Sequence, residues 1–242
     1  MSTILSLILS TCQKTLEQDA YPVGSAPLKL LFLFSAAALV CTGASAATRP
    51  TTESTASTQP IDAVSVVAGR GVDHNFLTLP KAIVSGPEWE RSTFGAVSVS
   101  KGYGTLGHSF DALANTPLKS VLHGGEAVLV KHQGLQHHVE AGAAYMVKTP
   151  FLHLGPAAVS AGTGIGLSHA FGTPSYEDGS REDPADRYRT QLLILVDVEW
   201  KLTNAKNWSL LMRVHHRSGA YGLIAPPKVG SNFLAIGLRH TL

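Results

Sequence analysis

Stretches in which apolar and polar residues alternate, separated by clusters of Gly, Pro, Asn and Asp, recur along the chain from residue 63 onward. A period of two places successive side chains on opposite faces of a β-strand, whereas an amphipathic helix requires a period near 3.6. The alternating stretches are about ten residues long, as expected of strands that cross a bilayer. The sequence therefore predicts an all-β domain.

The clearest alternation lies at residues 188–202. One face carries Leu192, Ile194, Val196, Val198, Trp200 and Leu202, and the other carries Gln191, Asp197, Glu199 and Lys201. An apolar face that ends in Trp and lies opposite a charged face is typical of a transmembrane barrel whose apolar groups meet lipid. A soluble lipocalin-like barrel, which would turn its apolar faces inward, is the alternative that strand number leaves open.

Eight such segments can be counted, at residues 63–71, 94–105, 120–132, 135–148, 154–171, 188–202, 207–217 and 231–242. We therefore predict an eight-stranded antiparallel transmembrane β-barrel over residues 63–242. If both chain ends are periplasmic, the long links at 172–187 and 219–230 are extracellular, as is usual in outer-membrane barrels. The link at 106–119 is the exception, because it is long for a periplasmic turn.

Two patterns describe the interior of this predicted barrel. A row of small residues is expected on the inner face, where it leaves room for large side chains from opposite strands; it comprises Ser160, Gly162, Gly164, Gly166 and Ser168. Charged residues with inward parity are expected to form a buried polar network; they are Arg213, Asp197, Glu199 and Lys201.

The N-terminal part of the chain is typical of an exported protein. Residues 1–46 are predicted to be a signal peptide with an extended N-region, because Lys29 precedes a short apolar run that ends in Ala44-Ser45-Ala46. The run is too short for a bilayer-spanning helix, which needs roughly twenty residues. Residues 47–62 are rich in Thr, Ser and Pro and are expected to be a flexible leader. The predicted location is the bacterial outer membrane.

Several classes of function are disfavoured. The net charge of +2 comes from scattered residues, so no basic surface for nucleic acid is indicated. Cys12 and Cys41 both lie in the predicted signal peptide, which leaves the mature chain without thiol chemistry. His132, His137 and His138 surround a turn at Gly134, but no acidic or Cys partner has useful spacing, so a solvated loop tip is favoured over a metal site. No cofactor and no oligomeric state are indicated.

The segment Arg213-Val-His-His-Arg-Ser-Gly219 ends the seventh predicted strand. Parity places His216 and Ser218 on the lipid-facing side, with His215 turned inward. Two polar groups two residues apart on a strand lie side by side, close enough for a histidine nitrogen to take the serine proton after a modest rotamer change. The segment thus predicts a Ser–His pair at the membrane surface.

The sequence Val-His-His-Arg-Ser-Gly-Ala-Tyr-Gly-Leu, followed by Val-Gly-Ser-Asn-Phe and a final strand, resembles the C-terminal end of the lipid A 3-O-deacylase family, over about the last thirty residues. The resemblance implies an eight-stranded barrel in which Ser218 is the nucleophile and His216 its base. The implied substrate is the 3-linked acyl ester of lipid A, the lipid anchor of lipopolysaccharide in the outer leaflet, and no cofactor is implied.

This chain departs from the family at two site positions. The family's Glu on the last strand, which orients the histidine, matches Asn232 here, and Gly219 stands where the family has Asn. An amide can hold the imidazole tautomer but cannot stabilise an imidazolium as a carboxylate does. Backbone N–H groups from Gly219 onward are the expected substitute in the oxyanion hole.

The alternative function is a catalytically silent outer-membrane barrel with a structural or surface-binding role. In that case His216, Arg217 and Ser218 form the polar rim where a strand leaves the membrane, with Arg217 at lipid phosphates. A carboxylate within hydrogen-bond reach of His216 would favour the enzyme, and its absence would favour the silent barrel.

Overall fold

The computed structural model describes residues 62–177, 188–202, 204–226 and 229–242. The predicted signal peptide at 1–46 and nearly all of the predicted leader lie outside the described residues. Of the predicted extracellular link 172–187, only the first part, through residue 177, is described.

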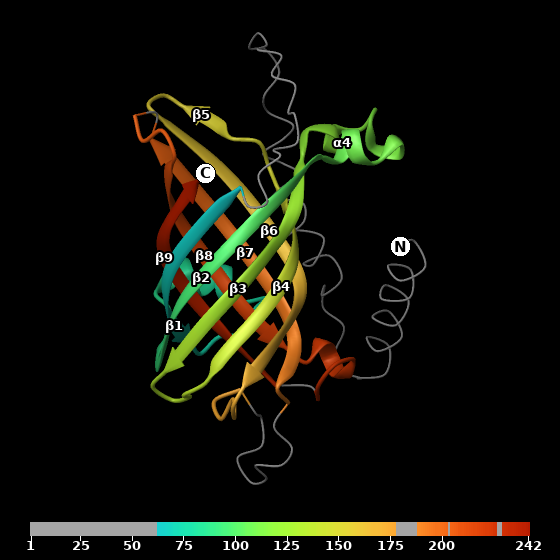
Figure 1. Cartoon of the computed structure of the whole chain (residues 1–242). Helices are drawn as coiled ribbons and strands as arrows, with labels where there is room; N and C mark the ends of the chain where they lie inside the picture. The colour runs from blue at the N-terminus through green and yellow to red at the C-terminus, as the bar shows by residue number, and fades with distance from the viewer. Residues whose placement is uncertain (1–61, 178–187, 203, 227–228) are drawn as a thin grey trace.

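The described chain is dominated by antiparallel strands. They are β1 (Ala63–Val72), β2 (Trp89–Thr105), β3 (Leu122–Gln133), β4 (Val139–Lys148), β5 (Leu152–Leu154), β6 (Ala157–Phe171), β7 (Thr190–Leu202), β8 (Trp208–Ser218) and β9 (Gly230–Thr241). Each long strand pairs with its neighbours in the chain, β4 pairs with β6, and β1 pairs with β9, which closes the sheet (Figure 1). The short β5 pairs with the start of β6 outside this ring. The predicted eight-stranded barrel is confirmed.

Short helical turns occupy the longer links. They are α3 (Leu79–Ser85) between β1 and β2, α4 (Leu106–Ser109), η1 (Asp111–Leu113) and η2 (Pro117–Ser120) between β2 and β3, and η4 (Ala220–Gly222) between β8 and β9. Among the described residues, no helix is long and apolar enough to cross a membrane. The long link after β2 is thus an ordered unit, which stands beside the barrel at one end (Figure 1).

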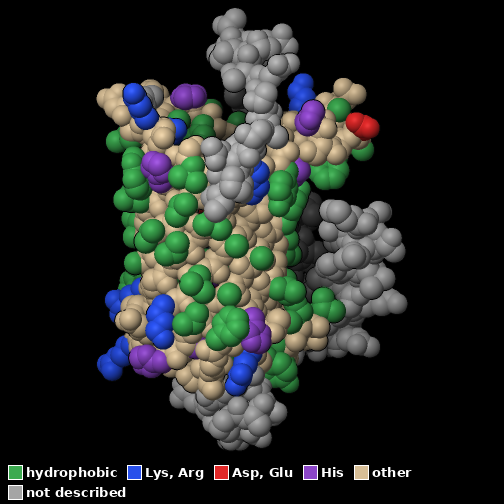
Figure 2. Space-filling model, in the orientation of Figure 1, with side chains coloured by type: hydrophobic (Ala, Val, Ile, Leu, Met, Phe, Trp, Pro, Cys, Tyr) green, Lys and Arg blue, Asp and Glu red, His purple; other side chains and the backbone are tan. Residues whose placement is uncertain are grey.

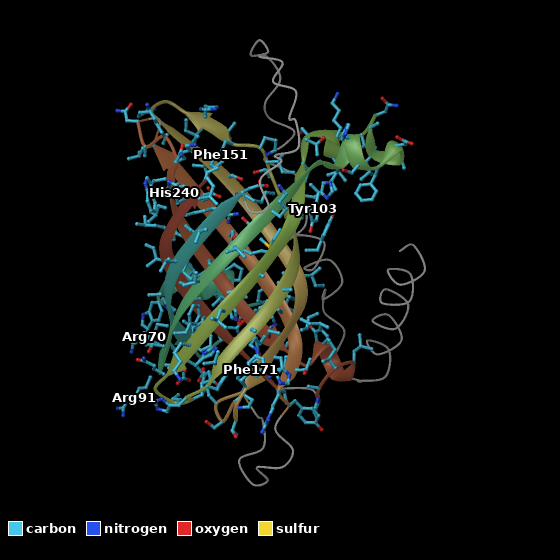
Figure 3. The ribbon with its side chains drawn as sticks, in the orientation of Figure 1. Arg70, Arg91, Tyr103, Phe151, Phe171 and His240 are labelled. Atoms are coloured by element: carbon cyan, nitrogen blue, oxygen red, sulfur yellow. The ribbon has the colours of Figure 1, made fainter. Side chains whose placement is uncertain are left out.

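Both ends of the described chain lie at the same end of the barrel, because Ala63 pairs with Thr241. We call this the proximal end and the opposite one the distal end. Figure 3 labels Tyr103, Phe151 and His240 near the proximal end, and Arg70, Arg91 and Phe171 near the distal end. The links β1–β2, β3–β4, β6–β7 and β8–β9 are distal.

The outer wall of the barrel is apolar. On β7, Trp200 and Leu202 are 52% and 63% exposed, whereas Asp197 is 2% exposed. In Figure 2, the middle of the visible wall shows hydrophobic side chains scattered among uncharged groups and backbone, and Lys, Arg and His gather toward its two ends. This orientation contradicts the lipocalin-like alternative, which requires apolar faces turned inward.

Side chains fill the centre of the barrel. A buried apolar cluster includes Phe94, Leu193, Leu195 and Phe233. The predicted small-residue row does face inward. At Gly164, for example, an added Cβ would lie 2.1 Å from Sδ of the buried Met146, so this position has no room for a side chain. The interior is therefore a packed core in which glycines make space for larger neighbours.

Charged groups on the proximal side of this cluster are paired. Arg213 makes two hydrogen bonds of 2.7 Å to Asp197 and an ion pair of 2.6 Å with Glu126. Glu199 pairs with Lys148, so the predicted network is confirmed for Arg213, Asp197 and Glu199. The prediction is wrong for Lys201, which makes no ion pair within the described residues, because its position at the end of β7 leaves it partly exposed.

A closed barrel satisfies the backbone hydrogen bonds of every wall strand internally, which is what a strand needs in lipid. Together with the apolar wall and the polar interior, this closure defines a transmembrane barrel of the outer-membrane type. The chain is an outer-membrane β-barrel protein.

Candidate active site

In the distal half of β8, successive side chains point alternately toward the lipid-facing wall and toward the interior. His216 and Ser218 point outward, while His215 and Arg217 point inward and are 1% and 0% exposed. The predicted parity is therefore confirmed. The burial of Arg217 shows that its predicted place at lipid phosphates is wrong, because an inward position on the strand cannot reach the membrane surface.

His216 is held by Asn232 on the neighbouring strand. The two residues are direct partners in the register of β8 and β9, and His216 Nδ1 lies 2.7 Å from Asn232 Oδ1. Asn232 Nδ2 donates to the backbone oxygen of His74, also at 2.7 Å. Because the amide nitrogen of Asn232 donates to His74, the amide oxygen of Asn232 faces the imidazole and accepts a hydrogen bond from Nδ1–H of His216. His216 then carries its lone pair on Nε2.

The link between β1 and β2 covers this pair. Phe76 stacks on the His216 ring, with centroids 4.4 Å apart and an interplanar angle of 27°. A cavity of about 350 Å³ lies beside the pair, lined by polar groups that include Asn75, Ser231 and Asn232. The imidazole is thus fixed on one edge by an amide and on one face by an aromatic ring.

Ser218 is half-buried at the end of β8, opposite Leu192 on β7 and Gly230 on β9. No hydrogen bond joins Ser218 to His216 in the described part of the chain. Catalytic hydrogen bonds are often long or poorly aligned before substrate binds, so this geometry is compatible with a pair that closes on a substrate.

The backbone after Ser218 alters the predicted oxyanion hole. The N–H of Gly219 donates to the oxygen of Val229 at 3.1 Å, so it is not available to a substrate. Ala220 and Tyr221 adopt positive φ angles of 53° and 55°, a strained arrangement for residues with a Cβ. Their N–H groups have no acceptor within the described residues. Of the backbone donors predicted from Gly219 onward, those of Ala220 and Tyr221 therefore have no acceptor among the described residues, whereas that of Gly219 has one.

The interior beneath the pair holds two buried glutamates. Glu140 accepts from His215 at 3.1 Å and from His132 at 2.9 Å. Glu177, in the link after β6, bonds Arg217 and accepts from Ser231 at 2.8 Å. Neither carboxylate is hydrogen-bonded to His216; among the described residues its side-chain partner is an amide.

The three histidines near Gly134 do not share one environment. His137 is exposed as predicted, but His132 and His138 are buried, and the prediction of a solvated tip is wrong for both. Gly134 allows the tight turn that folds them inward, with a φ of 94° and no room for a Cβ. Burial lowers the pKa of His138 to about 4, so this ring is neutral at pH 7.

Sequence reasoning missed a second serine–histidine contact, at the proximal end. Ser109 Oγ lies 2.7 Å from His123 Nε2, and Tyr145 Oη lies 2.9 Å from His123 Nδ1. The three residues come from the β2–β3 link, β3 and β4. No local motif could have revealed this contact, because only the packing of the link against the wall brings the groups together.

Comparison with known proteins gives fold likeness alone. No family model matches the chain, and no curated protein matches it. Among solved structures, the outer membrane enzyme PagL is similar with a TM-score of 0.46 and 11% identity, over 74% of this chain and 99% of that one. Neisserial surface protein A (NspA) is similar with a TM-score of 0.43 and 11% identity, over 74% of this chain and 96% of that one.

Proposed function

We propose that this chain is an outer-membrane esterase that removes an ester-linked acyl chain from lipid A without a metal or organic cofactor. Ser218 acts as nucleophile, His216 as general base, and Asn232 as the residue that orients the base. The 2.7 Å contact between His216 Nδ1 and Asn232 Oδ1 carries the proposal, because the same amide donates to His74 and so cannot turn its nitrogen toward the ring.

The fixed tautomer is what the reaction needs. With the proton on Nδ1, the Nε2 lone pair is free to accept the proton of Ser218. Oγ attacks the ester carbonyl carbon, and the oxyanion meets the N–H groups of Ala220 and Tyr221, which have no acceptor among the described residues. The tetrahedral intermediate breaks its bond to the sugar oxygen, which takes the proton from His216 and leaves as a hydroxyl. Water then cleaves the acyl-serine by the same route and releases the fatty acid.

The position of the pair suits a lipid substrate. Both side chains belong to the wall face of β8, so an acyl chain lying against the apolar wall reaches them without entering the packed interior. With both chain ends in the periplasm, the distal end meets the outer leaflet, where lipopolysaccharide resides. The assignment to lipid A follows the resemblance of residues 214–223 to the deacylase family.

The test is mass spectrometry of lipid A from cells that express the chain or its variants. The wild type should remove one hydroxy-acyl chain, and Ser218→Ala and His216→Ala should leave lipid A intact while the barrel still folds. Ser109→Ala is the matched control, because Ser109 also contacts a histidine but lies at the proximal end. Deacylation that survives Ser218→Ala, or that depends on Ser109, would contradict the assignment.

A second candidate function is the silent barrel. It is favoured by one observation: the residue that holds His216 is an amide, and no carboxylate within the described residues bonds the ring. An amide does not stabilise the imidazolium that forms during attack. Unchanged lipid A in cells with correctly assembled wild-type protein would support this candidate.

A further inference from the structure

The interior of the distal end contains a cluster of polar groups that the proposed reaction does not use. His132, His138 and Glu140 are all buried, and one ligand atom from each lies within 4.8 Å of the other two. They come from the end of β3, the following turn and the start of β4, so one tight turn brings them together.

The unsatisfied member of the cluster is His138. The residue is 2% exposed, and neither of its ring nitrogens has a hydrogen-bond partner within the described residues. A buried polar group without a partner costs about 1–3 kcal/mol, so such a group in a folded protein points to a missing partner such as an ion. The ring stacks on His132 with centroids 4.5 Å apart, which keeps it beside the other two groups.

The local charge also favours a cation. Among the described residues, the charged groups that face the cluster are Glu140, Glu177 and Arg217, so two carboxylates stand against one guanidinium. A buried net charge is costly unless it is paired. A bound cation would supply the missing positive charge.

We propose that His132, His138 and Glu140 bind a divalent transition-metal cation of the zinc class inside the distal end of the barrel. Two imidazoles and one carboxylate are the ligand types of Zn²⁺, which takes them at about 2.0–2.2 Å in tetrahedral geometry. Such bond lengths place ligand atoms about 3.3 Å apart. His132 Nε2 and Glu140 Oε2, now 2.9 Å apart, need only a small separation to reach this spacing.

Neighbouring groups provide the outer contacts of such a site. His215 lies 3.1 Å from the second oxygen of Glu140, and Gln136 lies 3.1 Å from Nδ1 of His132. Metal binding at His132 Nε2 requires the other tautomer of the ring, in which the single proton has moved from Nε2, where it lies between His132 and Glu140, to Nδ1. Gln136 Oε1, which has no hydrogen-bond partner among the described residues, then accepts the proton on His132 Nδ1. For this the Gln136 amide must turn, which breaks the 3.2 Å hydrogen bond from its nitrogen to Glu177.

A metal at this site would stabilise β8, the strand that carries the proposed active site. Through Glu140 it contacts His215 and approaches Arg217 at 3.6 Å, the two inward residues that flank His216 on β8. The inference does not depend on the proposed esterase function, because its test measures binding and not turnover.

The test is titration of the chelator-treated full barrel in detergent with ZnCl₂ against a chromophoric chelator, and separately with CoCl₂. We expect one tight equivalent of zinc per chain and the visible absorption of tetrahedral Co²⁺. His138→Phe keeps the ring volume and the stack on His132 but removes the nitrogens. Its affinity should fall by more than the about 10–100-fold that loss of an outer contact costs.

His137→Ala is the matched control, because His137 is the exposed neighbour in the same turn. It should bind zinc as the wild type does, and both variants should show the wild-type mobility of a folded barrel. Equal affinity of the wild type and His138→Phe, loss of binding in His137→Ala, or an octahedral Co²⁺ spectrum would each overturn the proposal.

Discussion

At the scale of single residues, the decisive contact is the one between His216 and Asn232. Its geometry depends on a third group, because the His74 carbonyl engages the amide nitrogen and leaves the oxygen to the imidazole. In the triad precedent, replacing the carboxylate by an amide lowered the rate about 10⁴-fold through the wrong tautomer. Here the amide already favours the useful tautomer, so only the electrostatic part of that loss is expected.

We therefore predict that Asn232→Glu raises deacylation, but by less than about 10⁴-fold. The carboxylate would stabilise the imidazolium, although it cannot donate to the His74 carbonyl and must turn both oxygens away from it. Asn232→Ala, which removes the acceptor of Nδ1–H, should lower activity below the wild type. The rate of acyl release from purified lipid A measures both effects, and equal rates for all three proteins would exclude Asn232 from the mechanism.

At the scale of elements, β7 divides its side chains between lipid and core. Its outward residues include Ile194 and Val196, and its inward ones are buried against the apolar cluster and the Arg213 network. Since every outward position meets the bilayer at a different depth, the cost of a charge there should depend on distance from the strand centre.

Val196 occupies the middle of β7, so Val196→Arg should destabilise the barrel by about 2–4 kcal/mol and impair assembly. Leu202→Arg places the same charge at the proximal end of the strand and should cost about 0–1 kcal/mol. Unfolding by urea in lipid vesicles gives both free energies. Equal costs would mean that this face does not cross the bilayer.

At the scale of the whole molecule, closure between β1 and β9 leaves no free sheet edge in the described barrel. The interior is filled from end to end, with the Arg213 network at the proximal side, the apolar cluster in the middle and the glutamate–histidine groups at the distal side. Such a barrel opens only if many backbone hydrogen bonds break in a medium that cannot replace them.

We accordingly predict that the barrel keeps its fold in SDS at room temperature and migrates differently after boiling. The measurement is gel mobility of membrane fractions with and without heating. A protein recovered from the soluble periplasm, or one whose mobility does not change on heating, would contradict the membrane assignment.

The sequence by itself determined the wall of the barrel. Strand parity is a local property with a period of two, so Trp200 could be placed outside and Asp197 inside without knowledge of the neighbours. The same parity, with the resemblance at the C-terminal end, brought His216, Ser218 and Asn232 to one face, and the register of β8 and β9 agrees.

Only the tertiary structure decided which inward and loop residues meet. Asn232 and the His74 carbonyl are 158 positions apart, and Gln136 and Glu177 are 41 apart, so neither contact leaves a periodic signal. His132 and His138 looked solvated because Glu140, which accepts from His132 and lies beside His138, belongs to the next strand and faces the interior. Parity fixes the face that a side chain occupies, but the closure of the sheet fixes its partners across the barrel.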